Sequence, residues 1–156
     1  MSSQSLHIEA ILERAEAGVS SYLRTAVEDG AISESQFQTA SANVIPTLTQ
    51  WLHDPELDRI SPNLKGGIAD AVEAGRWEDI VNAFRQSCRF GTGGIRGMMA
   101  FDRESIVRLK EEGLDARILK GPNTLNNAVL LRTSAGVARF GKEGGRNFDR
   151  IVIGYD

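Results

Sequence analysis

A glycine-rich stretch at residues 90–97 holds the residue types best suited to binding chemistry. It consists of Phe90-Gly91-Thr92-Gly93-Gly94-Ile95-Arg96-Gly97. Glycine tolerates positive φ and leaves room beside the backbone, so such a run exposes N–H groups that can surround an anion. Arg96 adds a planar guanidinium that matches a phosphate, and Thr92 adds a short hydroxyl. The stretch predicts a loop that approaches a phosphorylated ligand closely, through Thr92, Gly93, Gly94 and Arg96.

A tight turn is the alternative interpretation of the same stretch. In that case the glycines serve only packing and the arginine is solvated, and spacing alone does not separate the two. Two familiar nucleotide fingerprints do not fit. The sequence has no Gly-Lys-Ser/Thr ending of a P-loop here, and the glycine spacing is not the Gly-x-Gly-x-x-Gly of a dinucleotide fold.

Composition places the chain among soluble globular proteins. Its 156 residues are 41% hydrophobic and 25% charged, with a net charge of −3. Residues 1–86 hold 6 basic and 13 acidic residues, a net charge of −7, whereas residues 87–156 hold 12 and 8, a net charge of +4. Neither balance indicates a nucleic acid or a membrane as partner. A basic, glycine-rich second part suits a small anionic ligand.

Cysteine and histidine usage narrows the chemistry further. Cys88 is the single cysteine, so no internal disulfide forms and a reducing compartment is expected. His7 and His53 are far apart in sequence, which argues against a zinc site and against an activated thiol. Cys88 is expected to be a buried structural thiol. The sequence has neither a signal peptide nor a membrane-spanning run, so a cytoplasmic location is expected.

Residues 1–86 are predicted to form a helical N-terminal extension. An amphipathic helix spans residues 5–29 and stops at Gly30. Ser33 and Gln36 have the spacing of a capping box and open a second helix, which Pro46 should kink or divide. Asp54-Pro55 ends that helix. A third helix runs from Ser61-Pro62 to Gly75 and a fourth carries Trp77, Ile80, Val81 and Phe84, and both tryptophans are assigned to the core.

The function of these helices stays open at this level. They can form an extension ahead of a catalytic domain, or a module for interaction or dimerisation. Their apolar stripes are consistent with both.

Residues 87–156 alternate between element types. Residues 98–101 are expected to form a strand, and residues 102–120 a charged surface insertion that is compatible with a helix. A turn follows at residues 121–127. A helix over residues 128–140 has an expected inward face of Val129, Leu130, Thr133, Val137 and Phe140. Residues 150–156 are predicted to form a buried parallel strand that ends at Asp156.

These elements resemble, in order, the opening of the first domain of the α-D-phosphohexomutases, the phosphoglucomutase and phosphomannomutase superfamily. That domain begins with Phe-Gly-Thr-x-Gly-Leu/Ile-Arg-Gly. A Gly-x-Asn-Arg-Met-Asn turn, a helix and a Val-Val-Ile-Gly-Tyr-Asp strand follow. In this chain Asn123 and Asn126 keep the asparagine spacing, while Thr124 and Leu125 replace arginine and methionine. The resemblance covers residues 90–156 and favours a phosphoglucomutase, because of the helical extension and the FGTGGIRG form.

The resemblance implies an α/β fold, in which the extension (residues 1–86) precedes an incomplete, mixed three-layer α/β/α domain I (residues 87–156). It implies an isomerase that moves a phosphoryl group between C1 and C6 of a hexose through a phosphoserine, a bisphosphorylated intermediate and Mg²⁺. The family's phosphoserine, magnesium and sugar-binding loops lie further downstream. This chain is therefore expected to hold no catalytic serine and no metal ligand, and to be inactive alone.

Site and partner expectations follow from the same resemblance. Thr92 and Arg96 would hold a phosphate or the phosphoserine region. Asn123 and Asn126 would either contact the ligand or form the turn and cap the helix. The expected partner is a phosphorylated hexose, with no nucleic acid and no membrane. Self-association is expected through the incomplete sheet or the helical extension.

Overall fold

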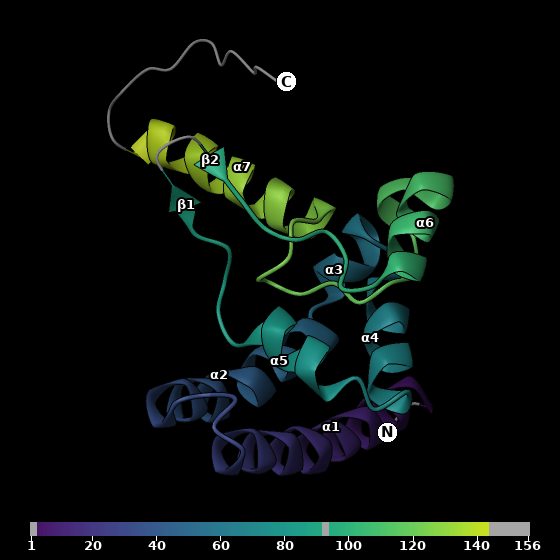
Figure 1. Cartoon of the computed structure of the whole chain (residues 1–156). Coiled ribbons are helices and arrows are strands. Elements are labelled where there is room, and N and C mark those ends of the chain that lie inside the picture. Colours follow the sequence, from purple (N-terminus) through teal and green to yellow (C-terminus); the bar gives the residue numbers. More distant parts are fainter. Residues whose placement is uncertain (1–2, 92–93, 144–156) are drawn as a thin grey trace.

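The computed structural model describes residues 3–91 and 94–143, which are mostly helical (Figure 1). They form seven α-helices, one 3₁₀ helix and two short strands. In chain order the elements are α1 (Ser3–Glu28), α2 (Glu34–His53), α3 (Pro55–Ile60), α4 (Leu64–Glu73), α5 (Trp77–Phe84), β1 (Phe90–Gly91), β2 (Gly94–Ile95), α6 (Arg103–Glu112), η1 (Gly113–Asp115) and α7 (Asn127–Glu143).

Helices α1 and α2 pack against each other, and the link between them carries the predicted signals. Gly30 has a φ of 70°, the left-handed conformation that glycine adopts most readily at a helix end. The Ser33 hydroxyl accepts a hydrogen bond from the Gln36 backbone N–H at 3.3 Å. The Gln36 side-chain oxygen accepts one from the Ser33 backbone N–H at 2.8 Å. The predicted capping box is confirmed.

The apolar faces of α1, α2, α4 and α5 meet in one hydrophobic core. Trp51 and Phe84 lie edge to face there, with their ring centroids 5.9 Å apart. Gly18 lets α1 lie directly on the Trp77 ring, because a Cβ at residue 18 would overlap that ring. Both tryptophans therefore serve packing, as predicted. The fully buried side chains include Leu23, Leu48, Leu52, Leu57, Leu64, Ile68, Ile80 and Phe84.

Pro46 was expected to kink or to divide the second helix. It does not divide α2. The helix is continuous from Glu34 to His53, with the proline in its interior. Proline removes one backbone hydrogen bond from a helix. Val44 and Leu48, on either side of it, are fully buried in the core. Packing of this face outweighs the local cost of the proline.

The segment after α2 contains a helix that the sequence pattern did not indicate. Asp54 ends α2 as predicted and also begins α3, because its carboxylate accepts a hydrogen bond from the Glu56 N–H at 2.8 Å. Pro55 occupies the first turn of α3, where its missing N–H is not needed. The next helix, α4, begins at Leu64 rather than at Ser61-Pro62.

Residues 116–122 pack against α4 and α5. Leu119 belongs to the main core. Gly67 of α4 lies on the backbone of Ile118, where a Cβ would overlap it. A Cβ at Gly121 would lie 2.5 Å from the carbonyl oxygen of Ala83. The predicted surface insertion at residues 102–120 is therefore only partly right: α6 lies outside, whereas the following segment is buried.

The described part of residues 87–156 contains little β structure. Strands β1 and β2 form an antiparallel pair of two residues each, and Met98 makes an isolated parallel bridge with Thr124. The strand expected at residues 98–101 is therefore reduced to that single bridge. The strand expected at residues 150–156 lies outside the described residues. The helical part of the expected fold class is confirmed, while the α/β/α domain and the division at residue 87 stay predictions.

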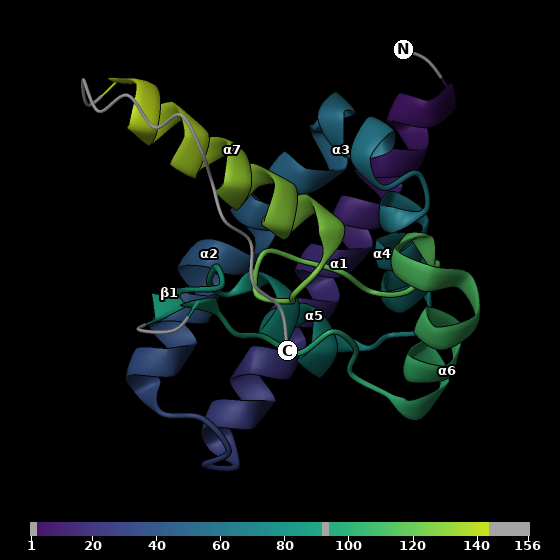
Figure 2. The ribbon, with the colours of Figure 1, turned by 90° about the horizontal axis from the view of Figure 1, so that it is seen from above.

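Helix α7 lies on the side of the molecule opposite α1 and α2 (Figures 1 and 2). Its expected inward face is only partly right, because Val129 packs on the core and Thr133 is half-buried. Leu130, Val137 and Phe140 are 41%, 53% and 64% exposed, and only the first turn, with buried Ala128 and partly buried Val129, packs on the core. Leu130, Val137 and Phe140 therefore stay exposed in the described part of the chain.

Candidate functional site

The glycine-rich stretch lies at the surface around β1 and β2. Of the predicted ligand-binding residues, Thr92 and Gly93 fall outside the described residues. Gly94 has a φ of 126° with open space where a Cβ would be, so its backbone conformation alone favours glycine. Arg96 is exposed and forms no ion pair with any described residue. A glycine with positive φ, beside a cation that has no ion-pair partner among the described residues, is suited to binding an anion.

Gly97 joins the glycine-rich stretch to the predicted asparagine turn. A Cβ at this position would lie 2.9 Å from the Cys88 sulfur and 3.2 Å from the Leu125 nitrogen. The Leu125 N–H donates to the Met98 carbonyl at 2.8 Å, and the Cys88 N–H donates to the Pro122 carbonyl at 2.8 Å. Two segments more than twenty residues apart in sequence are thus held side by side. This close approach requires glycine at residue 97.

The two asparagines use their side chains within the chain. Asn126 is 3% exposed; its amide donates to the Gly121 carbonyl at 2.9 Å, and its side-chain oxygen accepts from the Val129 N–H at 3.0 Å. The Asn123 amide donates to the Asn82 carbonyl at 2.7 Å. These contacts favour the turn-forming and capping alternative for both residues.

Thr124 occupies the position where the phosphohexomutase motif carries an arginine. Its side chain is fully buried, and its hydroxyl exchanges hydrogen bonds with both the N–H and the carbonyl of Gly121, at 3.1 and 3.0 Å. A buried hydroxyl closes the turn, whereas an arginine there would need an open path to solvent. In this chain, position 124 supplies no charge to a ligand.

Cys88 lies against Gly97 of the glycine-rich stretch. The thiol is half-buried, and burial raises its pKa. A raised pKa disfavours the nucleophilic thiolate at neutral pH. The contact with Gly97 supports the predicted structural role, but the thiol is half-buried rather than buried as expected.

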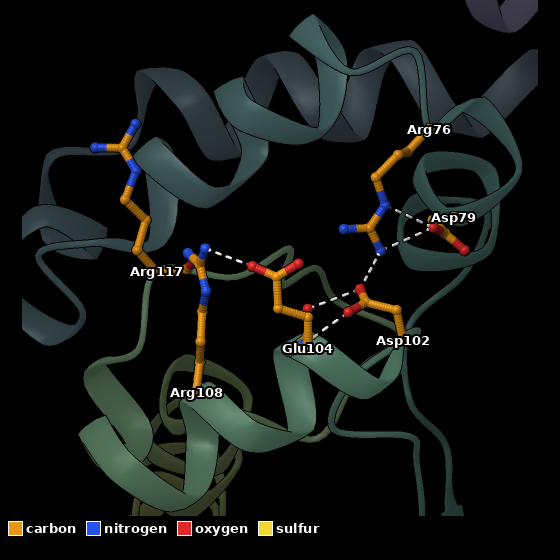
Figure 3. A network of polar contacts seen from close by, with 7 residues as sticks. Arg76, Asp79, Asp102, Glu104, Arg108 and Arg117 are labelled. Atoms are coloured by element: carbon orange, nitrogen blue, oxygen red, sulfur yellow. Dashed lines mark hydrogen bonds and ion pairs between the residues drawn. The ribbon is translucent and has the colours of Figure 1, made fainter.

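A second polar cluster, which no sequence motif indicated, joins α6 and the segment after it to α4 and α5 (Figure 3). Arg76, at the start of α5, contacts Asp79 at 2.9 Å and Asp102 at 2.6 Å. Asp102 also caps α6, because it accepts hydrogen bonds from the backbone N–H and the hydroxyl of Ser105, both at 2.7 Å. An aspartate three residues before a serine at the start of a helical pattern was the available sequence signal.

Two further ion pairs belong to the same cluster. Arg117 binds Asp70 through two hydrogen bonds of 2.7 and 2.6 Å, and Arg108 binds Glu104 at 2.8 Å. A pocket of about 390 Å³ lies among these side chains. Since each of its arginines is already paired with a carboxylate, the pocket offers no free charge to an anion. We interpret the cluster as a polar attachment of α6.

The pKa shifts in this cluster agree with paired charges. The hydrogen bond from Arg117 is the main cause that lowers the pKa of Asp70. Burial alone would raise the pKa of Asp102, but hydrogen bonds from Ser105 and the charge of Arg76 outweigh it, so this pKa is lowered too.

Lys120 is a buried cation directly before the asparagine turn. Its side chain is 2% exposed; its ammonium donates to the Leu114 carbonyl and lies 3.5 Å from the Ser61 hydroxyl. Burial lowers its pKa, against an opposing influence of Asp115 and Glu112. Composition and periodicity did not predict the burial of Lys120, because lysines are seldom buried.

Metal ligands were not expected in this chain. Among the described residues, no group of three or more histidine, cysteine, aspartate or glutamate side chains is placed to hold a metal ion. In the same part of the chain, no helix combines the length and apolar character needed to cross a bilayer.

No family model, curated protein or solved structure matches this chain. The resemblance to the phosphohexomutases therefore rests on the residues and the order of its motifs.

Proposed function

We propose that this chain is the N-terminal part of a cytoplasmic phosphohexomutase, with phosphoglucomutase favoured, and that residues 91–97 bind a phosphoryl group. The single observation that carries the proposal is the junction at Gly97. The glycine-rich stretch and the asparagine turn, which follow each other in the family's motif order, are in direct contact there. An ordinary surface turn would not need this contact with a distant segment.

The role of this chain's residues is to bind and orient. Arg96 offers its planar guanidinium to the phosphoryl oxygens, and backbone N–H groups of the stretch add neutral donors. The Gly97 contact with Cys88 and Leu125 holds the stretch in place, so that the ligand need not order it. These groups stabilise negative charge and transfer no proton.

The covalent chemistry belongs to the rest of the proposed enzyme. By resemblance, a downstream serine carries the phosphoryl group between C1 and C6 of the hexose. Bound Mg²⁺ would offset charge on that group. None of these 156 residues is assigned as the nucleophile or as a metal ligand.

A second candidate is a non-catalytic interaction module, and one observation favours it. Leu130, Val137 and Phe140 leave exposed apolar side chains along one side of α7. Such a surface serves association when nothing covers it. The coding sequence that follows Asp156 separates the candidates. Ser-Arg, then a Ser-His-Asn-Pro loop and an Asp-Gly-Asp segment, are expected for the mutase, and an immediate stop codon would favour the module.

Binding of glucose 1,6-bisphosphate to the 156-residue chain tests the phosphate site directly, by isothermal titration calorimetry. Arg96→Gln should weaken binding about tenfold or more, since a charge-assisted contact contributes roughly 1.5–3 kcal/mol. Arg103→Gln is the matched control: it removes the same charge at another exposed position and should leave the affinity unchanged. Equal affinities of the Arg96→Gln variant and the unaltered chain would refute the assignment.

A further inference from the structure

A pocket elsewhere on the chain is lined by residues from four separate segments, three of which contribute polar side chains. It measures about 320 Å³ and lies where α2, the segment after α5, the asparagine turn and the start of α7 meet. Volumes in this range are typical of small-molecule sites. Its lining residues are Thr47, Gln50, Trp51, Ser87, Cys88, Pro122, Val129, Arg132 and Thr133.

The uncharged polar groups of this pocket have no internal hydrogen-bond partners among the described residues. Elsewhere in α2, Thr39 and Thr49 bond back to carbonyls one turn earlier, at 2.9 and 2.8 Å. No such bond to a described residue engages the side chains of Thr47, Gln50, Ser87 and Thr133, which all line this pocket. Gln50 and Ser87 are exposed, and Thr47 and Thr133 are half-buried. Hydroxyls and amides both donate and accept, so this set matches a ligand that does the same.

Arg132 is held in a fixed position at the rim of the pocket. One of its nitrogens forms an ion pair with Asp54, and its guanidinium carbon lies 5.6 Å from the centre of the Trp51 ring. A guanidinium fixed on two sides loses little freedom when its other N–H groups bind a ligand. Because Asp54 neutralises its charge and no carboxylate of the described residues lines the pocket, hydroxyl groups suit the site better than a strongly charged ligand.

We infer that this pocket is a second binding site, which takes a small polyhydroxylated ligand of hexose size through its hydroxyl groups. Thr47, Ser87 and Thr133 bond the ligand hydroxyls, Gln50 adds a donor and an acceptor, and Arg132 donates to a ligand oxygen. Cys88 lines this site and also lies against Gly97, but none of residues 91–97 lines the site. It therefore does not depend on the proposed phosphate site.

The test follows the amide NMR signals of the isotope-labelled chain during titration with glucose, glucose 6-phosphate or inorganic phosphate. Glucose and glucose 6-phosphate should bind with similar affinity and shift the signals of residues 47–51, 87–88 and 129–133. Inorganic phosphate should leave these signals in place. If inorganic phosphate shifts these same signals with an affinity equal to that of glucose 6-phosphate, the pocket is an anion site instead. Unmoved signals with glucose would also overturn the inference.

Two variants and two controls locate the site. Thr133→Val keeps the shape of the side chain and removes its hydroxyl, so the dissociation constant for glucose should rise about fivefold. Thr25→Val, at an exposed position of α1, should not change it. Ser87→Ala should act like Thr133→Val, without a change in any helix. Arg96→Gln should leave glucose binding intact, and loss of binding in this variant would place the ligand at the glycine-rich stretch.

Discussion

The Arg76 guanidinium lies 2.6 Å from the Asp102 carboxylate and thereby joins the start of α5 to the start of α6. Asp102 is at the same time the N-cap of α6. Ser105 is the one buried residue of α6, so the helix adds little to the core. Its attachment therefore depends on paired charges, in contrast to the apolar packing of α1, α2, α4 and α5.

Asp102→Asn should weaken this attachment, because asparagine still caps the helix but carries no charge. We expect a loss of about 1 kcal/mol in the free energy of unfolding, discounted for partial exposure of the pair. Urea denaturation at low salt measures it, and high salt should shrink the difference. Glu104→Gln, in a more exposed ion pair, is the control with little effect. A loss for Asp102→Asn no larger than this control would contradict the account.

Acid should reduce stability through the same carboxylates. The pKa values of Asp70 and Asp102 are lowered in the folded chain. Their contribution is therefore fully present above the unfolded-state pKa of about 3.9 and is lost as the pH falls through the folded-state values. Stability measured between pH 6 and 2 (roughly the range that brackets those values) should fall less steeply in an Asp70→Asn/Asp102→Asn variant. Parallel curves for the variant and the unaltered chain would exclude these groups.

Gly97→Ala should destabilise the junction between the glycine-rich stretch and the asparagine turn. The added Cβ would lie 2.9 Å from the Cys88 sulfur, and overpacking of this kind costs about 1–3 kcal/mol. The double variant Gly97→Ala/Cys88→Ala should recover much of the loss, because it removes the opposing atom. Gly136→Ala, in open space on α7, should instead stabilise the chain slightly. Failure of the double variant to recover would show that another contact fixes residue 97.

Lys120→Met should change how stability depends on alkaline pH. The pKa of Lys120 is lowered by burial, so between its folded-state pKa and the unfolded value of about 10.4 the unfolded chain binds more protons. Stability of the unaltered chain should therefore gain from this residue as pH rises through that interval. In the variant this gain disappears, as thermal unfolding across alkaline pH can show. Lys110→Met, at an exposed position, should keep the pH profile of the unaltered chain.

The apolar face of α7 should promote self-association. Val137→Asp/Phe140→Asp places charges on that exposed face and should shift the chain toward monomer. Analytical ultracentrifugation over a range of concentrations measures this shift. Ala135→Asp, on another face of the same helix, should leave the distribution as it was. If the unaltered chain is already monomeric at the highest concentrations, the interaction module loses its support.

Local signals predicted the first two helices well. Ser33, Gln36 and Gly30 act through neighbours in sequence, so the first two helices could be bounded from sequence. Pro46 and α7 could not be judged in the same way. Burial of Val44 and Leu48 holds α2 together across the proline, and exposure of Phe140 depends on what packs against α7. Tertiary context outweighs local preference in both cases.

The candidate site could be predicted only in part, because the sequence identifies its segments but not the contacts between them. Residue types and order identified residues 90–97 and the asparagine turn. Their contact through Gly97 depends on folding, as do the internal hydrogen bonds of Asn126. The Arg76–Asp102 pair joins residues far apart in sequence, and no periodic pattern could indicate it.

The central claim is that the glycine-rich stretch binds a phosphoryl group, and amide NMR with glucose 1,6-bisphosphate tests it most directly. The account predicts saturable shifts of the Gly94, Ile95, Arg96 and Gly97 amide signals, which Arg96→Gln weakens and Arg103→Gln preserves. Unchanged signals of these four residues at saturating ligand would contradict it.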